Sequence, residues 1–171
     1  MISSAPLMPH QPLIDGFEFA TAGATQQGVS PLESFARLRD MLASDAGEIA
    51  WTLQGVRDDR GRPSLRVSVR GRVLLRCQRC LEATPFEVQA EAILVLAATQ
   101  AEIDADPVDV QAPDRVLAAK EMPVRDLIED ELVLALPYAP RHESCAARPA
   151  RSAGAKVSPF AGLRGLMRSK H

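Results

Sequence analysis

The sequence is poor in aromatic residues and has no long apolar run. Phe, Trp and Tyr make up only 4% of the 171 residues, so the core of a folded domain must be mainly aliphatic. The longest apolar runs, residues 92–98 and 132–136, are far too short to span a bilayer. Residues 1–14 contain neither the basic nor the apolar segment of an export signal. These absences predict a cytoplasmic protein with no membrane partner.

Signatures of catalysis are missing as well. The chain contains no nucleophile elbow, no glycine-rich phosphate loop and no zinc-protease motif. Of its three His residues, only His142 has other polar candidates near it. The carboxylates with the closest spacing fall at helical positions that predict a mostly solvent-facing surface: Asp126, Glu129, Asp130 and Glu131. We therefore expect a non-enzymatic protein without a small-molecule substrate.

The overall composition fits an ordinary globular chain. Hydrophobic residues make up 46% of the sequence and charged residues 25%, and the length allows one domain with a core. We predict a lead-in segment over residues 1–29 and a single domain over residues 30–145. Residues 146–171 are rich in Arg, Ala, Ser and Gly, and are predicted to be a mobile basic tail with a short terminal helix.

Charge is distributed in blocks that the net charge of −2 conceals. Residues 57–79 hold eight Arg and two Asp, and residues 141–171 hold seven Arg or Lys and one Glu. Residues 98–131 hold ten Asp or Glu and three Arg or Lys. This sign asymmetry indicates partners of opposite charge. Arg outnumbers Lys by 17 to 3, which favours bidentate phosphate contacts but is also what a GC-rich genome produces.

Hydrophobic periodicity predicts an α+β fold with two main helices. Ser30, Pro31 and Glu33 have the spacing of a capping box, so we expect a helix from there to about residue 45. A second helix is predicted over about residues 123–136, because its apolar positions fall on one face and Pro137 follows.

Alternation of apolar and polar residues predicts the strands. They are expected near residues 49–54, 65–77 and 86–96, with Gly71 marking a bend or bulge in the second. Residues 99–121 are predicted to be mainly loop with a short strand, and the lead-in to contain one short extended segment near residues 13–19. The strands together predict an antiparallel β meander or a barrel-like sheet.

Cys77 and Cys80 form a C-x-x-C pair, which lets two sulfur atoms face one point at a turn. His142 and Cys145, an H-x-x-C pair after the second helix, would complete a tetrahedral Cys₃His site for a structural Zn²⁺. Two other interpretations stay open. C-x-x-C also occurs in thiol oxidoreductases, although there it belongs at a helix N-terminus beside a βαβ unit. A pair of half-buried thiols at a hairpin turn would have the same spacing.

A basic stripe runs along the second predicted strand and into the C-x-x-C pair. Its members are candidates for phosphate or RNA contact: Arg66, Arg70, Arg72, Arg76 and Arg79. The alternative is a solvated strand face that the acidic residues 99–131 compensate. Sheets that read RNA usually present stacking aromatics, and here Trp51 and Phe86 fall on apolar faces. The residues alone therefore give no support for sequence-specific RNA reading.

Four segments of the chain, residues 75–82, 126–137, 141–145 and 158–163, match the motifs of one protein family. Taken together they resemble the bacterial YceD family of large ribosomal RNA subunit accumulation proteins. Residues 75–82 are similar to its C-x-R-C-L segment, and residues 126–137 to its helix that ends in L-A-L-P. Residues 141–145 are similar to its H-x-x-C ending. Residues 158–163 are similar to its N-P-F-A-x-L segment, with Ser158 in place of Asn. The four occur in order over about residues 30–168.

The resemblance implies a role in the synthesis, processing or stability of large-subunit (23S) ribosomal RNA, and hence in ribosome biogenesis. It implies large-subunit rRNA or a pre-ribosomal particle as the partner, and it assigns no catalytic residue. One alternative is a protein-interaction adaptor that recruits a basic ribosomal protein through the acidic helix face. The other alternative is a redox protein that uses the thiols of the C-x-x-C pair.

Overall fold

The computed structural model describes residues 12–105 and 112–145. Its centre is a six-stranded sheet in the order β2-β4-β5-β6-β7, with β3 pairing to β5 beside that path. These strands are β2 Thr25–Pro31, β3 Leu42–Ser44, β4 Glu48–Arg57, β5 Pro63–Arg76, β6 Ala83–Ala97 and β7 Arg115–Leu117. A two-stranded sheet joins β1 Leu13–Ile14 to β8 Met122–Pro123. The helices are α1 Gly16–Thr21, α2 Gln100–Ala105 and α3 Val124–Ala135.

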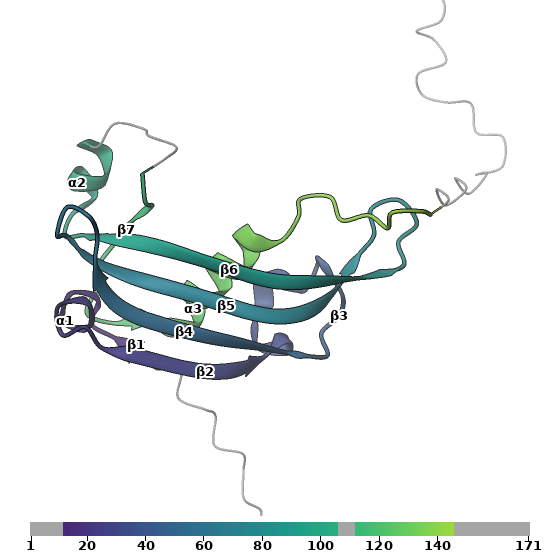
Figure 1. Cartoon of the computed structure of the whole chain (residues 1–171), viewed down its shortest axis with the longest axis horizontal. Coiled ribbons are helices and arrows are strands. Elements are labelled where there is room, and N and C mark those ends of the chain that lie inside the picture. Colours follow the sequence, from purple (N-terminus) through teal and green to yellow (C-terminus); the bar gives the residue numbers. More distant parts are fainter. Residues whose placement is uncertain (1–11, 106–111, 146–171) are drawn as a thin grey trace, which may run out of the picture.

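The large sheet is open, with β2 and β7 at its two edges (Figure 1). From β2 to β6 all neighbours are antiparallel, whereas β7 runs parallel to β6. The strands and helices confirm the predicted α+β class. Among the described strands the two edges do not pair with each other, so the sheet is not a closed barrel.

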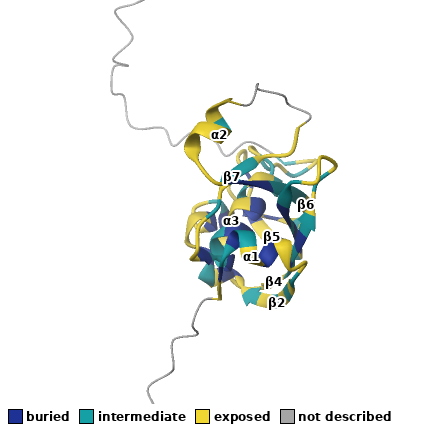
Figure 2. Cartoon of the chain, turned by 90° about the vertical axis from the view of Figure 1, so that its left-hand side faces the viewer, coloured by how far each residue is buried: buried dark blue, intermediate teal, exposed yellow. Residues whose placement is uncertain are grey.

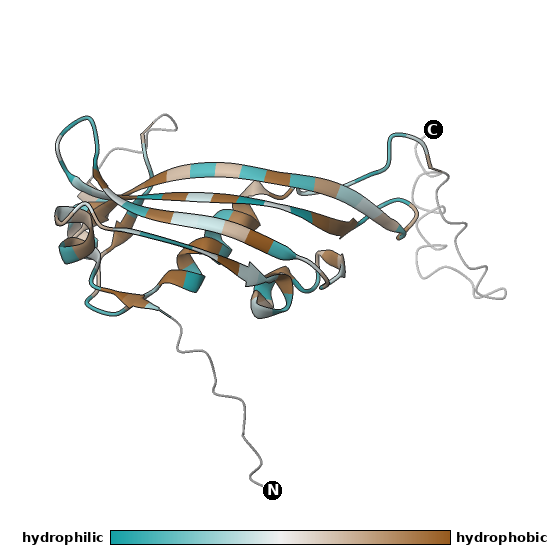
Figure 3. Cartoon of the chain, turned by 60° about the horizontal axis from the view of Figure 1, so that its bottom comes forward, coloured by the Kyte–Doolittle hydropathy of each residue, from teal (hydrophilic) through white to brown (hydrophobic). Residues whose placement is uncertain are grey.

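One face of the sheet packs on α3, and the other faces solvent. Along β5 the odd-numbered residues from Leu65 to Leu75 are buried except for the half-buried Gly71, and they meet the buried apolar side of α3. Figure 3 shows this alternation of hydropathy along the long strands, and Figure 2 shows the buried residues gathered between the sheet and α3. Burying one such aliphatic side chain contributes about 1.5–3 kcal/mol, so this layer holds the domain together.

The helix predicted from Ser30 is wrong. Ser30 and Pro31 end strand β2, and two short 3₁₀ turns follow at Leu32–Ser34 and Ala36–Leu38. The Ser30 hydroxyl does not cap a helix, because it accepts a hydrogen bond from Trp51 Nε1 at 2.9 Å. The four apolar residues at helical spacing in this stretch are all buried, so the spacing predicted the core correctly and its secondary structure incorrectly: Leu32, Phe35, Leu38 and Leu42.

Three further expectations about secondary structure also differ from the structure. Gly71 marks no bulge, since β5 keeps one register with β4 and β6 through it, and a Cβ there would lie 2.5 Å from Ile49 Cδ1. The short extended segment expected near residues 13–19 is present as β1, but it covers only two residues, and most of the range belongs to α1, whose N-cap is Asp15. Residues 99–121 contain α2 as well as the short strand β7. Part of the predicted lead-in, including β2, thus belongs to the sheets.

The second predicted helix is confirmed as α3, but its acidic residues are placed differently from the prediction. Glu129 and Glu131 are 5% and 8% exposed, so half of the predicted solvent-facing group is buried. Glu129 Oε1 accepts a hydrogen bond from the Arg37 backbone N–H at 2.7 Å, and its other oxygen lies 3.1 Å from Arg37 Nε. Arg37 also pairs with Asp130 at 2.6 Å. Arg37 therefore ties the second 3₁₀ turn to α3.

The basic tail and its short helix, predicted for residues 146–171, lie outside the described residues. Within residues 12–105 and 112–145, none of the helices has the length and apolarity needed to cross a bilayer.

Candidate functional site

The C-x-x-C pair forms a tight turn between β5 and β6, which we call the knuckle (residues 77–82). It lies at the end of the sheet opposite α1 and α2 (Figure 1). The Cys77 N–H donates to the Glu82 carbonyl and the Leu81 N–H to the Cys77 carbonyl, both at 2.9 Å. Leu81 has a φ of 67°, the left-handed conformation that glycine usually supplies. The backbone thus closes the turn and brings Cys77 and Cys80 close together.

The second half of the site arrives from the segment that follows α3. The Gln78 N–H donates to the Pro140 carbonyl at 2.9 Å, which fixes this segment against the knuckle. Arg79 Nη1 donates to the Cys145 carbonyl at 3.1 Å. These two hydrogen bonds join residues about 60 positions apart in the chain, and they bring His142 and Cys145 to the C-x-x-C pair.

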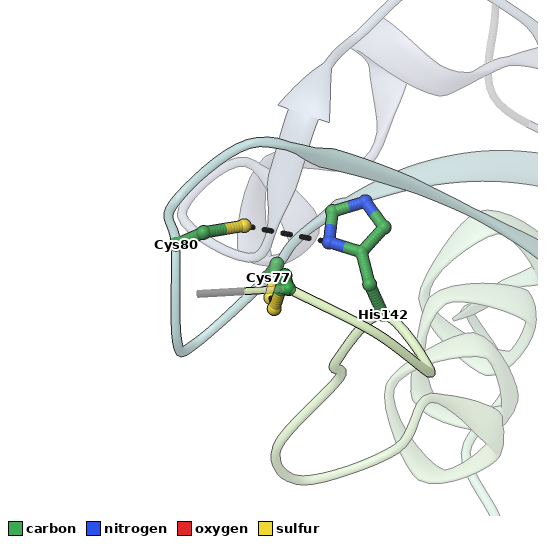
Figure 4. Close-up of side chains that lie close together, drawn as sticks. Cys77, Cys80 and His142 are labelled. Carbon is green, nitrogen blue, oxygen red and sulfur yellow. Dashed lines mark hydrogen bonds between the residues drawn. The ribbon is translucent and has the colours of Figure 1, made fainter. Parts of the chain in front are cut away.

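The structure brings the four predicted ligands together. Their ligand atoms all lie within 4.8 Å of one another, and they form the group Cys77, Cys80, His142 and Cys145. The Cys77 and Cys145 sulfurs are 3.8 Å apart, and Cys80 Sγ lies 3.4 Å from His142 Nδ1 (Figure 4). A tetrahedral zinc ion with Zn–S near 2.3 Å and Zn–N near 2.05 Å requires S···S and S···N separations of about 3.8 and about 3.6 Å. The two measured separations fit that geometry.

The imidazole of His142 is oriented for ligation through Nδ1. Its Nε2 lies 3.0 Å from the Ala83 carbonyl oxygen, an acceptor, so Nε2 carries the proton and donates. The Nδ1 lone pair then points toward the sulfurs. A metal-bound histidine commonly has this arrangement, in which a hydrogen bond at the other nitrogen fixes the tautomer.

The electrostatics of the cluster favour one thiolate strongly. Backbone N–H groups directed at its sulfur, that of Cys80 first and those of Arg79 and His142 after it, lower the pKa of Cys77 to about 5. A hydrogen bond with Cys77 raises the pKa of His142, and burial followed by the neighbouring sulfurs raises the pKa of Cys145. In the metal-free cluster a second thiolate is thus opposed by the first. A bound cation would remove that opposition, because it stabilises every thiolate that it contacts.

The five predicted phosphate-binding arginines do not share one environment. Arg66, Arg70, Arg72 and Arg76 lie on the solvent face of β5, while Arg79 lies in the knuckle. Two of them are neutralised across the strand pair, since Arg66 is 3.6 Å from Glu91 and Arg72 is 3.3 Å from Glu87. The alternative interpretation of the stripe placed the compensating carboxylates in residues 99–131. The structure places them on β6 instead.

Arg70 and Arg76 are exposed and form no ion pair within the described part of the chain. Arg70 lines a broad hollow of about 630 Å³ on the solvent face, together with Arg66 and polar side chains of β2 and β4. Arg76 lies at the knuckle end of the stripe and lines a different hollow beside the knuckle.

Sequence reasoning missed four features of the site. The Ala83 carbonyl and the Pro140 carbonyl orient His142 and its segment, and a carbonyl carries no side-chain signal. The positive φ of Leu81 has no signal in the sequence, because glycine and not leucine usually marks a left-handed turn position. Arg141 is exposed beside the cluster, where only the folded chain places it.

Comparison with known proteins gave one match. The family model described as "Large ribosomal RNA subunit accumulation protein YceD" matches residues 65–167, which is more than half of the chain. The matched range includes nearly all of β5, the knuckle, β6, α3 and all four candidate ligands. The curated proteins and the solved structures gave no match.

Proposed function

Because the chain belongs to the YceD family of large ribosomal RNA subunit accumulation proteins, we propose that it supports the accumulation of large-subunit (23S) rRNA. In this proposal it is a non-enzymatic factor of ribosome biogenesis that acts on the synthesis, processing or stability of that RNA. Its partner is the large-subunit rRNA or a pre-ribosomal particle, and it works in the cytoplasm, where bacterial ribosomes are assembled.

The observation that carries the proposal for the site is the convergence of four ligand atoms within 4.8 Å. We propose that they bind one structural Zn²⁺. The ion would hold the segment after α3 on the knuckle, where two hydrogen bonds already connect them. The donor set suits zinc over harder cations, since three sulfurs and one imidazole nitrogen leave no oxygen ligand for Mg²⁺ or Ca²⁺.

RNA contact through the basic stripe is supported most at its knuckle end. Arg76 is exposed without a carboxylate partner among the described residues, and Arg79 has only a carbonyl partner. Arg66 and Arg72 are weaker candidates, because Glu91 and Glu87 must be displaced before they can bind phosphate. Arg70 is intermediate, being unpaired itself but close to Glu91 in the same hollow.

The two alternative functions have less support. The acidic side of α3 offers few free carboxylates to a basic protein, since Glu129 and Glu131 are buried and Arg37 pairs with Asp130. A redox role for the cysteines is disfavoured because the C-x-x-C pair joins two strands and does not begin a helix.

Deletion of the gene, followed by measurement of 23S against 16S rRNA and of the ribosomal subunit profile, tests the function. We expect a deficit of 23S rRNA and of large subunits that the wild-type gene restores. Unchanged RNA levels with a normal profile would overturn the proposal. Complementation with Cys77→Ser separates the site from the scaffold, because this variant removes one ligand and keeps the aliphatic core.

A further inference from the structure

A hollow beside the knuckle is lined by side chains that suit a nucleobase. It is an open depression in the surface with a volume of about 510 Å³. Its lining is one cation, one anion and three apolar side chains: Arg76, Glu82, Ala43, Leu81 and Ala83. The hollow is separate from the four sulfur and nitrogen atoms of the metal cluster. Resting on the function proposed above, we propose that this hollow binds one unpaired base of single-stranded RNA.

Leu81 is the residue that points most directly to a ligand. It is a non-glycine residue with positive φ, and its side chain is 49% exposed. A left-handed backbone and a solvated apolar side chain both disfavour leucine at this position, and glycine would avoid both. An outlier of this kind is a reason to look for function. A base stacked on the side chain would bury the exposed apolar surface.

The walls of the hollow are held in place by backbone hydrogen bonds. The Arg76 N–H donates to the Met41 carbonyl at 3.1 Å, and the Glu82 carbonyl accepts from the Cys77 N–H at 2.9 Å. Arg76 and Glu82 line the same hollow without forming an ion pair. Both side chains therefore remain available to a ligand on a rigid backbone.

The chemistry of the two charged side chains selects among bases. A guanidinium plane stacks on bases of every kind. A carboxylate accepts hydrogen bonds only, so Glu82 fits the exocyclic amino group of cytosine and opposes the carbonyl that uracil has in its place. Cytosine and uracil are nearly identical in shape, so the hollow should prefer cytosine through Glu82 alone.

The adjoining surface supplies contacts for the phosphates on either side of that base. Arg79 and Arg141 are both exposed and lie on the two segments that meet at the metal cluster. Neither forms an ion pair with a carboxylate of the described chain. A strand of RNA that places one base in the hollow thus finds positive charge next to it, which favours a polyanion over a neutral pocket ligand.

The test is the affinity of the full-length protein for labelled short single-stranded oligoribonucleotides, one of cytidines and one of uridines, measured by fluorescence anisotropy. Leu81→Gly should weaken binding of the cytidine strand by about tenfold, because the base loses the apolar surface that the leucine side chain offers it. The fold should be kept, since glycine adopts positive φ readily. Leu134→Ala, which alters another exposed leucine on α3, is the matched control and should bind as the wild type does.

Two further variants test the base and phosphate contacts separately. Glu82→Gln should bring the affinities for the cytidine and uridine strands to near equality, because an amide both donates and accepts. Arg141→Gln should weaken both strands alike and reduce the salt dependence of log K by about 0.7, the value for one phosphate contact of a single strand.

Several outcomes would overturn the inference. Equal binding by wild type and Leu81→Gly, or no binding of either oligoribonucleotide by the wild type, would remove the base site. RNase-resistant capture of one protein that Leu81→Gly abolishes would reassign the hollow to a protein partner. These results leave the proposed function standing if deletion still lowers 23S rRNA, whereas normal 23S rRNA after deletion would remove the function and not the binding site.

Discussion

The middle of β5 and its end at the knuckle differ in how their charges and their packing are satisfied. In the middle, Arg66 and Arg72 on the solvent face pair with glutamates of β6 while Arg70 between them does not, and the opposite face packs on α3. At the knuckle end, Arg76 and Arg141 have no carboxylate partner among the described residues, and structure depends on hydrogen bonds and a Cys₃His cluster. The sheet is therefore a self-sufficient scaffold, whereas the knuckle, by our proposal, is completed by the zinc ion and the RNA base that it binds.

Truncating the core under α3 should give the largest loss of stability. Ile128 is fully buried between α3 and the sheet, so Ile128→Ala should lower the free energy of unfolding by about 2–5 kcal/mol. Urea denaturation measures this change. Leu134→Ala on the exposed side of the same helix should stay within about 0.5 kcal/mol. Similar losses for both variants would contradict the assignment of the core.

Removing metal should have the next largest effect, and it should be local. Native protein should contain about one zinc per chain by elemental analysis. After chelation, amides of the knuckle and of residues 139–145 should exchange faster with deuterium, because the cluster no longer holds them together. Amides in the centre of β5 should keep their protection. Metal-free native protein with an already protected knuckle would refute the zinc site, and uniform loss of protection would refute the independence of the sheet.

A smaller effect is expected from Glu131 in the scaffold. Burial, and then the nearby charge of Asp114, raises the pKa of this carboxyl above its usual range. The folded state therefore binds a proton more tightly than the unfolded state, so the carboxyl destabilises the fold at neutral pH and ceases to do so as pH falls through the folded pKa. Glu131→Gln should raise stability by less than about 1 kcal/mol at pH 7. The gain in stability should vanish in acid. A gain that grows in acid would show that folding does not raise the pKa of Glu131.

The smallest change in stability should come from an exposed ion pair in the middle of β5. Glu87→Gln releases Arg72 and should alter the unfolding free energy by less than about 0.5 kcal/mol. If pairing is what distinguishes the middle from the knuckle end, the freed arginine should raise affinity for both oligoribonucleotides and steepen the salt dependence. Arg72→Gln in the same background should reverse the gain. No gain in affinity would mean that geometry, rather than charge pairing, keeps RNA from the middle of the stripe.

Sequence patterns predicted those parts of the molecule that depend on local periodicity or spacing. The long strands and α3 follow from alternation and helical repetition, and the Cys₃His group from two short motifs. The capping box at Ser30 misled because its hydroxyl bonds to Trp51 on a neighbouring strand, a contact that local pattern does not contain. Glu129 was expected in solvent for a similar reason, since its partner Arg37 lies 92 positions earlier in the chain.

The site shows the same division between local and long-range information. The ligand types and their pairing in twos could be predicted, but the orientation of His142 depends on the carbonyl of Ala83, and any residue can supply a carbonyl. The sequence was equally unable to show which arginines have no carboxylate partner and remain available to bind phosphate. Arg66 and Arg76 look alike in the sequence, and only the register of β5 with β6 sets Glu91 beside the first and Ala83 opposite the second.

Leu81 has a consequence for attempts to evolve or engineer this protein. Replacing a non-glycine residue at positive φ with glycine relieves backbone strain, so a selection for thermostability should recover Leu81→Gly early. By our proposal the same change removes the platform for the RNA base. Thermostable variants chosen without a functional screen would then be the least active ones, and the trade-off between stability and activity would be visible at a single side chain.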